Sequence, residues 1–123
     1  MFLTLSGKVK KGKRQGKKLG FPTINIAVPN SIKKKQWGVY FSLIKIKEKF
    51  YPGITHLGPT KTFSLKGATC ETHLLTLRQD LYNKTVEKKL IFRFREVERF
   101  PSIAELQKQI KKDIKDAKKF FGL

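Results

Sequence analysis

Turn-forming residues recur at short intervals along most of this chain. Gly, Pro and Asn interrupt it from Gly7 to Asn83, and the runs between them are rich in Val, Ile, Phe, Tyr and Thr. This pattern is typical of short strands joined by tight turns, and it predicts a compact antiparallel β-barrel. The expected strands are Phe2–Lys10, Thr23–Val28, Val39–Lys47, Phe50–Leu57, Ala68–Leu77 and Val86–Arg95.

The last expected strand has a regular alternation of side chains. Side chains two residues apart point to the same face of a strand. We therefore expect two faces, one with Leu90, Phe92 and Phe94, the other with Lys89, Ile91, Arg93 and Arg95.

The chain changes character after residue 101. Ser102 followed three residues later by Glu105 is typical of a helix start, and Gly122 after Lys118 and Lys119 is typical of a helix end. A helix over about 102–121 would carry an apolar stripe of Ile103, Leu106, Ile110, Ile114, Ala117 and Phe121. We expect one domain over 1–123, with the barrel over about 1–100 and this helix packed on it. Contact of the helix with nucleic acid is the alternative.

The charge is large and unevenly distributed. The 123 residues include 28 Lys or Arg and 9 Asp or Glu, a net charge of +19, and no acidic residue occurs from Met1 to Lys47. Such a region attracts anions, so nucleic acid and phosphate-bearing small molecules are the candidate ligands. With 39% hydrophobic residues the chain is too apolar for a disordered basic tail.

Cysteine content and hydropathy indicate the compartment. Cys70 is the single cysteine, which excludes an internal disulfide and a cysteine-based zinc cluster. No apolar run approaches the roughly 18 residues of a membrane span. We expect a cytoplasmic protein that does not enter a membrane.

A glycine-rich basic segment is the first candidate site. Three glycines, Gly12, Gly16 and Gly20, are spaced four residues apart, and Lys13, Arg14, Lys17 and Lys18 lie among them. Backbone N–H groups and cations together suit a polyphosphate. A solvated basic hairpin is an equally good interpretation from these residues alone.

Two polar residues follow this segment. Thr23 and Asn25 are two apart on an expected strand and so share a face. Their neutral oxygens, together with phosphate oxygens, would suit Mg²⁺, which takes few protein ligands. Taken alone, hydrogen bonding at a strand start explains such a pair more often.

Glu71 is the third candidate. Period two places it on one face with His73, Leu75 and Leu77. A carboxylate in line with leucines lies at a barrel rim or in a pocket, and a partly buried one suits a general base. The alternative is an edge carboxylate paired with one of the many cations.

Several of these elements together resemble the ATP-dependent riboflavin kinases. The specific elements are Gly20–Phe21–Pro22–Thr23–x–Asn25, preceded by Gly12 and Gly16, and Glu71–Thr72–His73. Supporting elements are Gly38–Val39–Tyr40, Asp80–Leu81–Tyr82, Phe94–Arg95 and the C-terminal helix. The resemblance covers nearly the whole chain, with its elements in the right order. It extends to the kinase domain of bacterial bifunctional riboflavin kinase/FAD synthetases.

The resemblance implies a fold and a reaction. The fold is a mostly β, six-stranded antiparallel Greek-key-like barrel with a C-terminal α-helix. The reaction transfers the γ-phosphate of ATP to the 5′-hydroxyl of riboflavin, giving FMN and ADP, with Mg²⁺. A monomer or one half of a bifunctional enzyme is expected, with riboflavin and ATP as partners and only non-specific nucleic-acid binding. A basic nucleic-acid-binding barrel is the alternative function.

The resemblance also implies residue roles. Glu71 would be the catalytic base, and Thr23 and Asn25 would coordinate Mg²⁺. Adenine would pack near Leu75, Leu77, Leu81 and Tyr82, and the flavin ring near Arg95 and Phe100. The residues expected to wrap the nucleotide phosphates are Gly12, Lys13, Gly16, Lys17, Lys18, Leu19, Gly20, Phe21 and Pro22. Lys17 stands where the family usually has Arg, which keeps the charge but loses the bidentate fork.

Overall fold

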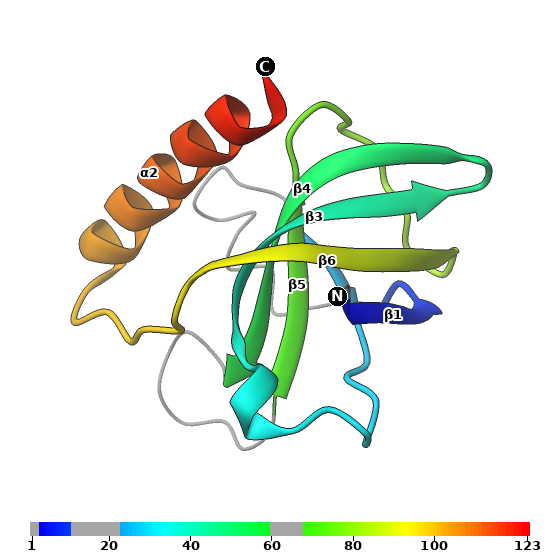
Figure 1. Ribbon diagram of the computed structural model, residues 1–123, viewed down its shortest axis with the longest axis horizontal. Coiled ribbons are helices and arrows are strands. Elements are labelled where there is room, and N and C mark those ends of the chain that lie inside the picture. Colours follow the sequence, from blue (N-terminus) through cyan, green and yellow to red (C-terminus); the bar gives the residue numbers. More distant parts are fainter. Residues whose placement is uncertain (1–2, 11–22, 60–67) are drawn as a thin grey trace.

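A computed structural model describes residues 3–10, 23–59 and 68–123 (Figure 1). The strands are β1 (Leu3–Lys8), β2 (Ile24–Ile26), β3 (Gly38–Ile46), β4 (Lys49–Pro59), β5 (Ala68–Leu74) and β6 (Thr85–Arg95). A 3₁₀ turn, η1 (Lys34–Gln36), precedes β3, and the helix α2 (Ile103–Phe121) ends the chain. The six expected strands and the helix are therefore confirmed, with ends that differ by a few residues.

The strands form one antiparallel sheet in the order β1-β6-β3-β4-β5-β2. The sheet curls until its two edge strands approach each other (Figure 1). Just beyond β1, the Lys10 N–H donates to the Asn25 carbonyl oxygen at 2.9 Å, and this bridge joins the two edges. The expected barrel is confirmed, as a curled sheet closed at this point.

One face of the sheet encloses the main core. Its centre is formed by side chains that alternate along the strands, as period two requires. The buried members of this interior cluster are Leu5, Val9, Ile24, Ile26, Tyr40, Ile44, Leu57, Cys70, Leu81, Val86 and Leu90.

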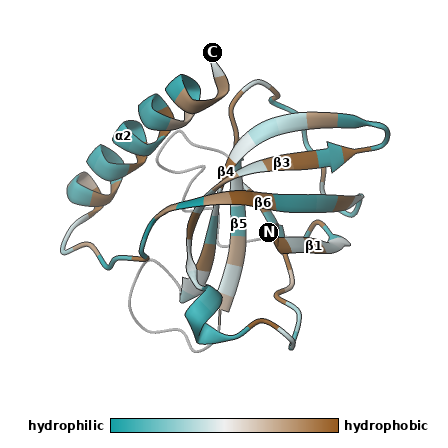
Figure 2. Ribbon diagram, in the orientation of Figure 1, coloured by the Kyte–Doolittle hydropathy of each residue, from teal (hydrophilic) through white to brown (hydrophobic). Residues whose placement is uncertain are grey.

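The opposite, outer face is covered in part by α2 (Figure 1). Val39, Phe41 and Ile54 pack there with Ala117 of α2, in what we call the outer cluster. Apolar and hydrophilic residues alternate along α2, as an amphipathic helix requires (Figure 2). The stripe that packs begins at Leu106, because Ile103 in the first turn is 67% exposed.

Both ends of α2 have the expected caps. The Glu105 N–H donates to Ser102 Oγ at 3.1 Å. Gly122 has a φ of 73°, a left-handed conformation that glycine adopts without steric cost. The cap therefore ends the helix where the sequence predicted.

The prediction that Leu90, Phe92 and Phe94 share one face is wrong. The register between β3 and β6 shifts twice, so that Phe41 lies opposite Phe92 whereas the next residue, Ser42, lies opposite Leu90. Leu90 joins the interior cluster, while the Phe94 ring stacks on Phe41 of the outer cluster with 4.1 Å between ring centroids. A β-bulge adds a residue to one strand and so breaks the alternation that the sequence suggests.

No helix in the described part of the chain is long and apolar enough to cross a membrane.

Candidate functional site

The candidate site begins with a row of cross-strand partners. Asn25 on β2 lies opposite Glu71 on β5, and Glu71 lies opposite His56 on β4. The row continues from His56 to Val39 on β3 and from Val39 to Arg95 on β6. Direct cross-strand partners project to the same face of a sheet. The fold therefore gathers an amide, a carboxylate, an imidazole and a guanidinium from four strands on the outer face.

A hollow lies along the second part of this row, from His56 through Val39 to Arg95, between the sheet and α2. Its volume is about 390 Å³ when the space open to solvent is included, so most of it is not enclosed. Its walls combine apolar and polar side chains: Val39, Ile54, His56, His73, Arg95, Glu98, Phe100, Leu106, Ile110 and Asp113. A concave site with apolar walls and a few convergent polar groups is the usual form of a small-molecule site.

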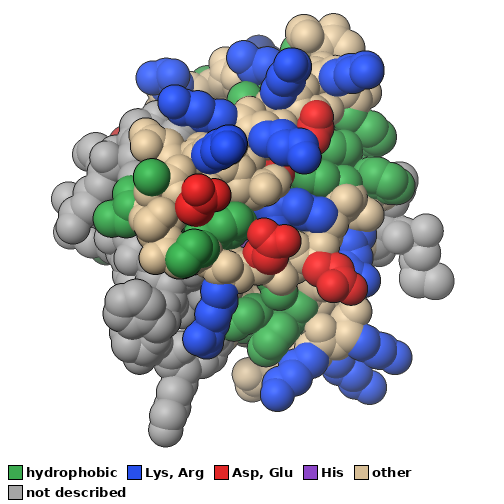
Figure 3. Space-filling view, turned by 90° about the vertical axis from the view of Figure 1, so that its left-hand side faces the viewer, with side chains coloured by type: hydrophobic (Ala, Val, Ile, Leu, Met, Phe, Trp, Pro, Cys, Tyr) green, Lys and Arg blue, Asp and Glu red, His purple; other side chains and the backbone are tan. Residues whose placement is uncertain are grey.

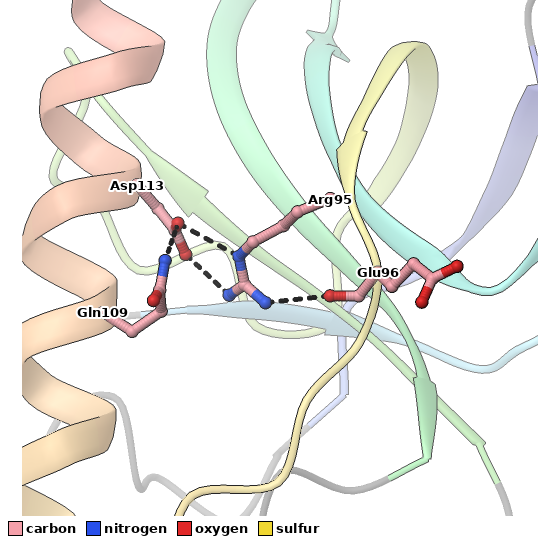
Figure 4. A network of polar contacts seen from close by, with 4 residues as sticks. All are labelled: Arg95, Glu96, Gln109 and Asp113. Carbon is pink, nitrogen blue, oxygen red and sulfur yellow. Dashed lines mark hydrogen bonds and ion pairs between the residues drawn. The ribbon is translucent and has the colours of Figure 1, made fainter.

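An ion pair joins the two sides of the hollow (Figure 4). The Arg95 Nε and Nη2 atoms donate to Asp113 Oδ1 and Oδ2 at 3.1 and 2.7 Å, a bidentate contact. Gln109 Nε2 donates to Asp113 Oδ1 at 2.8 Å, and Arg95 Nη1 donates to the Glu96 carbonyl oxygen at 3.0 Å. Asp113 is 4% exposed, and its pairing with Arg95 holds α2 against the end of β6.

A chain of buried hydroxyls lies on the interior face beneath the row. Thr55 Oγ1 is 2.7 Å from Ser42 Oγ and 2.7 Å from Thr72 Oγ1, and all three side chains are fully buried. Thr55 directly precedes His56, and Thr72 directly follows Glu71. The hydroxyls therefore connect β3, β4 and β5, and on β4 and β5 they lie next to residues of the row.

The predicted base and metal ligands are partly brought together. Asn25 and Glu71 are neighbours in the row, with Asn25 6% exposed and Glu71 half-buried. Thr23 is half-buried and directly precedes β2. The prediction that Glu71 and His73 share a face is confirmed by their partners His56 and Ile54, both of which line the hollow.

The residues predicted for the two rings differ in their surroundings. Arg95 and Phe100, predicted near the flavin ring, both line the hollow. Of the residues predicted near adenine, Leu75 packs on the outer cluster, whereas Leu81 is buried in the interior cluster. Tyr82 is 51% exposed and Leu77 is half-buried. Leu75 and Leu81 therefore pack in different clusters, and their role near adenine stays a prediction.

The phosphate-wrapping residues lie outside the described residues. These are Gly12, Lys13, Gly16, Lys17, Lys18, Leu19, Gly20, Phe21 and Pro22, and their role stays a prediction.

His56 and Asp113 were not singled out as site residues from the sequence. The strand register between β4 and β5 places His56 in the site, because it decides which residue lies opposite Glu71. Asp113 had a visible signal, since it lies three residues after Ile110 and four before Ala117, on the buried stripe of the helix. An acidic residue on such a stripe is almost never buried unless it is paired.

Thr23 and Asn25 contribute neutral oxygens to this site, and the Glu71 carboxylate lies beside Asn25. In the described ranges 3–10, 23–59 and 68–123, no group of three or more His, Cys, Asp or Glu is placed to hold a metal ion. The Asn25 amide oxygen and the Thr23 hydroxyl are hard ligands that fit Mg²⁺ when substrate phosphates supply the remaining coordination.

Proteins of known sequence resemble this chain over nearly its whole length. An RNA-binding riboflavin kinase of Bacillus subtilis is 39% identical over 121 residues, which cover 97% of this chain and 51% of that protein. A bifunctional riboflavin kinase/FMN adenylyltransferase of Escherichia coli is 34% identical over 120 residues, 97% of this chain and 38% of that protein. The chain thus spans about half the length, or less, of these relatives.

Solved structures share the fold. A Streptococcus pneumoniae structure described as a macrolide-efflux protein superposes with a TM-score of 0.80 at 28% identity, covering 94% of this chain and 38% of that one. A riboflavin kinase from Trypanosoma brucei superposes with a TM-score of 0.64 at 24% identity, covering 98% of this chain and 77% of that one.

The flavokinase family, described as riboflavin kinase, matches residues 2–121. That range includes the row, the hollow and α2. This chain belongs to the riboflavin kinase family.

Proposed function

We propose that this chain transfers the γ-phosphate of ATP to the 5′-hydroxyl of riboflavin, giving FMN and ADP. The observation that carries the proposal is the placement of Glu71 between Asn25 and His56, with the hollow beginning at His56. One candidate base thus lies between a candidate metal ligand and a concave surface of suitable chemistry. Family membership supports the same reaction.

In this proposal the flavin ring occupies the hollow, against Phe100 and beside Arg95. Glu71 accepts the proton of the 5′-hydroxyl while that oxygen forms a bond to the γ-phosphorus. The bond between the γ-phosphorus and the bridging oxygen breaks, and ADP leaves with the electron pair. Protein groups mainly position the partners and balance charge in phosphoryl transfer, so a single base is sufficient.

Asn25 and Thr23 would hold Mg²⁺ together with the nucleotide phosphates. The ion, when bound, would neutralise charge that develops on the phosphate oxygens. Asn25 is suited to this role because the bridge from Lys10 and the pairing with Glu71 fix its backbone on both sides. The basic segment 12–22 would complete the phosphate site.

The proposal is tested by incubating the protein with riboflavin, ATP and Mg²⁺ and separating the flavins by chromatography. We expect FMN from the wild type and a loss of about 10²–10⁴-fold in kcat for Glu71→Gln. Glu48→Gln, on the exposed turn between β3 and β4, is the matched control and should keep wild-type kcat. Absence of FMN would refute the activity, and equal turnover by Glu71→Gln would refute the assigned base.

A second candidate function is single-stranded nucleic-acid binding at the β3–β4 hairpin. Phe50 is 45% exposed there, and the Nζ atoms of Lys45 and Lys89 lie 5.8 and 5.0 Å from the centroid of its ring. An exposed ring among cations can stack on a base while the cations contact phosphates. The face of the molecule that carries α2 differs from this hairpin, because acidic and hydrophobic side chains lie between the Lys and Arg residues there (Figure 3).

This second function is tested by fluorescence anisotropy with a labelled single-stranded oligonucleotide at about 0.15 M salt. Specific use of the hairpin predicts that Phe50→Ala weakens binding about tenfold, the effect of losing one stacked base. Binding that depends on salt alone and is unchanged in Phe50→Ala would be non-specific attraction to the +19 charge.

A further inference from the structure

Lys88 is a lysine inside the barrel. It lies between Val86 and Leu90 on the interior face of β6, and its side chain is 0% exposed. Lysine is almost never fully buried unless its ammonium is paired, because removing a charge from water is costly. Burial lowers the pKa of Lys88, and the nearby Cys70 and Glu71 oppose this shift. An apolar residue would fill the same space without that cost.

The Lys88 side chain crosses the barrel interior. Its Nζ donates to the Ile24 carbonyl oxygen at 2.8 Å and to the Cys70 carbonyl oxygen at 3.0 Å. β3 and β4 lie between β6 and β5 in the sheet, and β2 lies one strand further, so these bonds do not belong to the sheet ladder. A neutral amine with two protons has enough donors for both carbonyls, as does an ammonium with three.

The two carbonyls have a definite relation to the candidate site. Ile24 directly precedes Asn25, and Cys70 directly precedes Glu71. Asn25 and Glu71 are cross-strand partners on the outer face, so Lys88 contacts the backbone just ahead of both from the inner face. The Lys88 amine thus binds the two peptide units that lead into Asn25 and Glu71, the first two residues of the row.

β2 is the strand that most needs such a contact. It has three residues and lies at one edge of the sheet. On the side of β2 that faces away from β5, the bridge between Lys10 and Asn25 is the described backbone link to the opposite edge of the sheet. Few ladder bonds allow a strand to open locally at low free-energy cost.

We propose that Lys88 is a positioning residue for the phosphoryl transfer, one that fixes β2 against β5 so that Asn25 and Glu71 keep their separation. The assignment of those two side chains rests on the proposed function. The contact with β2 and β5 does not rest on it. Lys88 acts from inside the barrel, through the backbone, and touches no substrate.

The test compares Lys88→Met with Lys84→Met. Methionine fills similar space without hydrogen-bond donors, and Lys84 is an exposed lysine whose loss removes the same charge. We expect amide hydrogen exchange of Ile24–Ile26 to become about tenfold faster in Lys88→Met. We also expect kcat to fall about tenfold while the KM for riboflavin stays within about twofold, since only the reacting groups are displaced. Lys84→Met should match the wild type in all three measurements.

Unchanged exchange in β2 together with unchanged kcat would overturn the proposal. So would a loss of kcat accompanied by faster exchange throughout the barrel, because that result indicates general destabilisation. If Lys88→Met does not fold, Lys88→Gln replaces it with the same expectations, since glutamine keeps a donor but is too short to span both carbonyls. If the wild type makes no FMN, the proposed function fails, and the exchange of β2 alone decides whether Lys88 holds that strand.

Discussion

Asn25 on β2 and Glu71 on β5 are direct cross-strand partners on the outer face of the sheet. The pair places a neutral amide beside a carboxylate, and the next partner in the row is His56 at the hollow. A cation held by the amide would therefore lie close to the carboxylate. This proximity connects the proposed metal site with the proposed base.

Replacing Asn25 by Ala should weaken the binding of Mg²⁺ and ADP. Loss of one polar ligand contact corresponds to about 1.4 kcal/mol, or about tenfold in the dissociation constant. Titration calorimetry measures this with MgADP, and riboflavin binding is the control that should stay within about twofold. A larger loss for riboflavin than for MgADP would contradict the assignment of Asn25 to the metal.

Replacing Asp113 by Ala should destabilise the fold. The substitution leaves the Arg95 guanidinium without its bidentate partner in a largely buried position. Removing one partner of such a pair costs about 3–5 kcal/mol when both are buried. Because the Arg95 side chain is 22% exposed, we expect the lower end of that range. Urea unfolding measures the loss, and Asp116→Ala, exposed on the same helix, should change stability little. Equal stability of the two variants would show that the ion pair contributes nothing.

Replacing Thr55 by Val should also destabilise the fold. Valine has nearly the same shape but leaves the hydroxyls of Ser42 and Thr72 without the partner between them. An unsatisfied buried polar group costs about 1–3 kcal/mol. Chemical denaturation should show this loss for Thr55→Val and almost none for Thr85→Val, whose side chain is exposed. A neutral result for Thr55→Val would mean that the two remaining hydroxyls find other partners.

The burial of Lys88 should make stability depend on pH. Its pKa in the folded state lies below the ordinary 10.5, so at pH values approaching 10.5 the unfolded chain binds more protons than the folded one. The free energy of unfolding therefore rises with pH over that range. Burial raises the pKa of the Cys70 thiol from 9.0, which has the opposite effect above pH 9.0.

Lys88 lowers the pKa of the Cys70 thiol through its charge and its hydrogen bond, so the two effects are separated only when both proteins carry Cys70→Ala. In that background, urea unfolding at about pH 7 and about pH 10 should show the stability of the protein with Lys88 increasing relative to that of Lys88→Met. A difference between the two proteins that does not change with pH would mean that Lys88 titrates normally.

Local chemistry made much of the fold predictable. Turn residues marked the ends of six strands, and Ser102 and Gly122 marked the ends of α2, because turns and caps depend on residues close together in the chain. The faces of β6 were not predictable, since the bulges opposite Phe41 and Val39 depend on how β3 pairs with that strand. The exposure of Ile103 likewise depends on where α2 leaves the sheet.

The sequence by itself determined the family, the order of the elements and the identity of Glu71 and Asn25 as candidates, because these follow from residue types at short spacing. The tertiary structure alone decided which residues meet. It placed His56 beside Glu71, Asp113 against Arg95, and the Lys88 ammonium beneath the pair. Such contacts join residues 15 to 64 positions apart, and they depend on strand register and on the curl of the sheet, which no local pattern specifies.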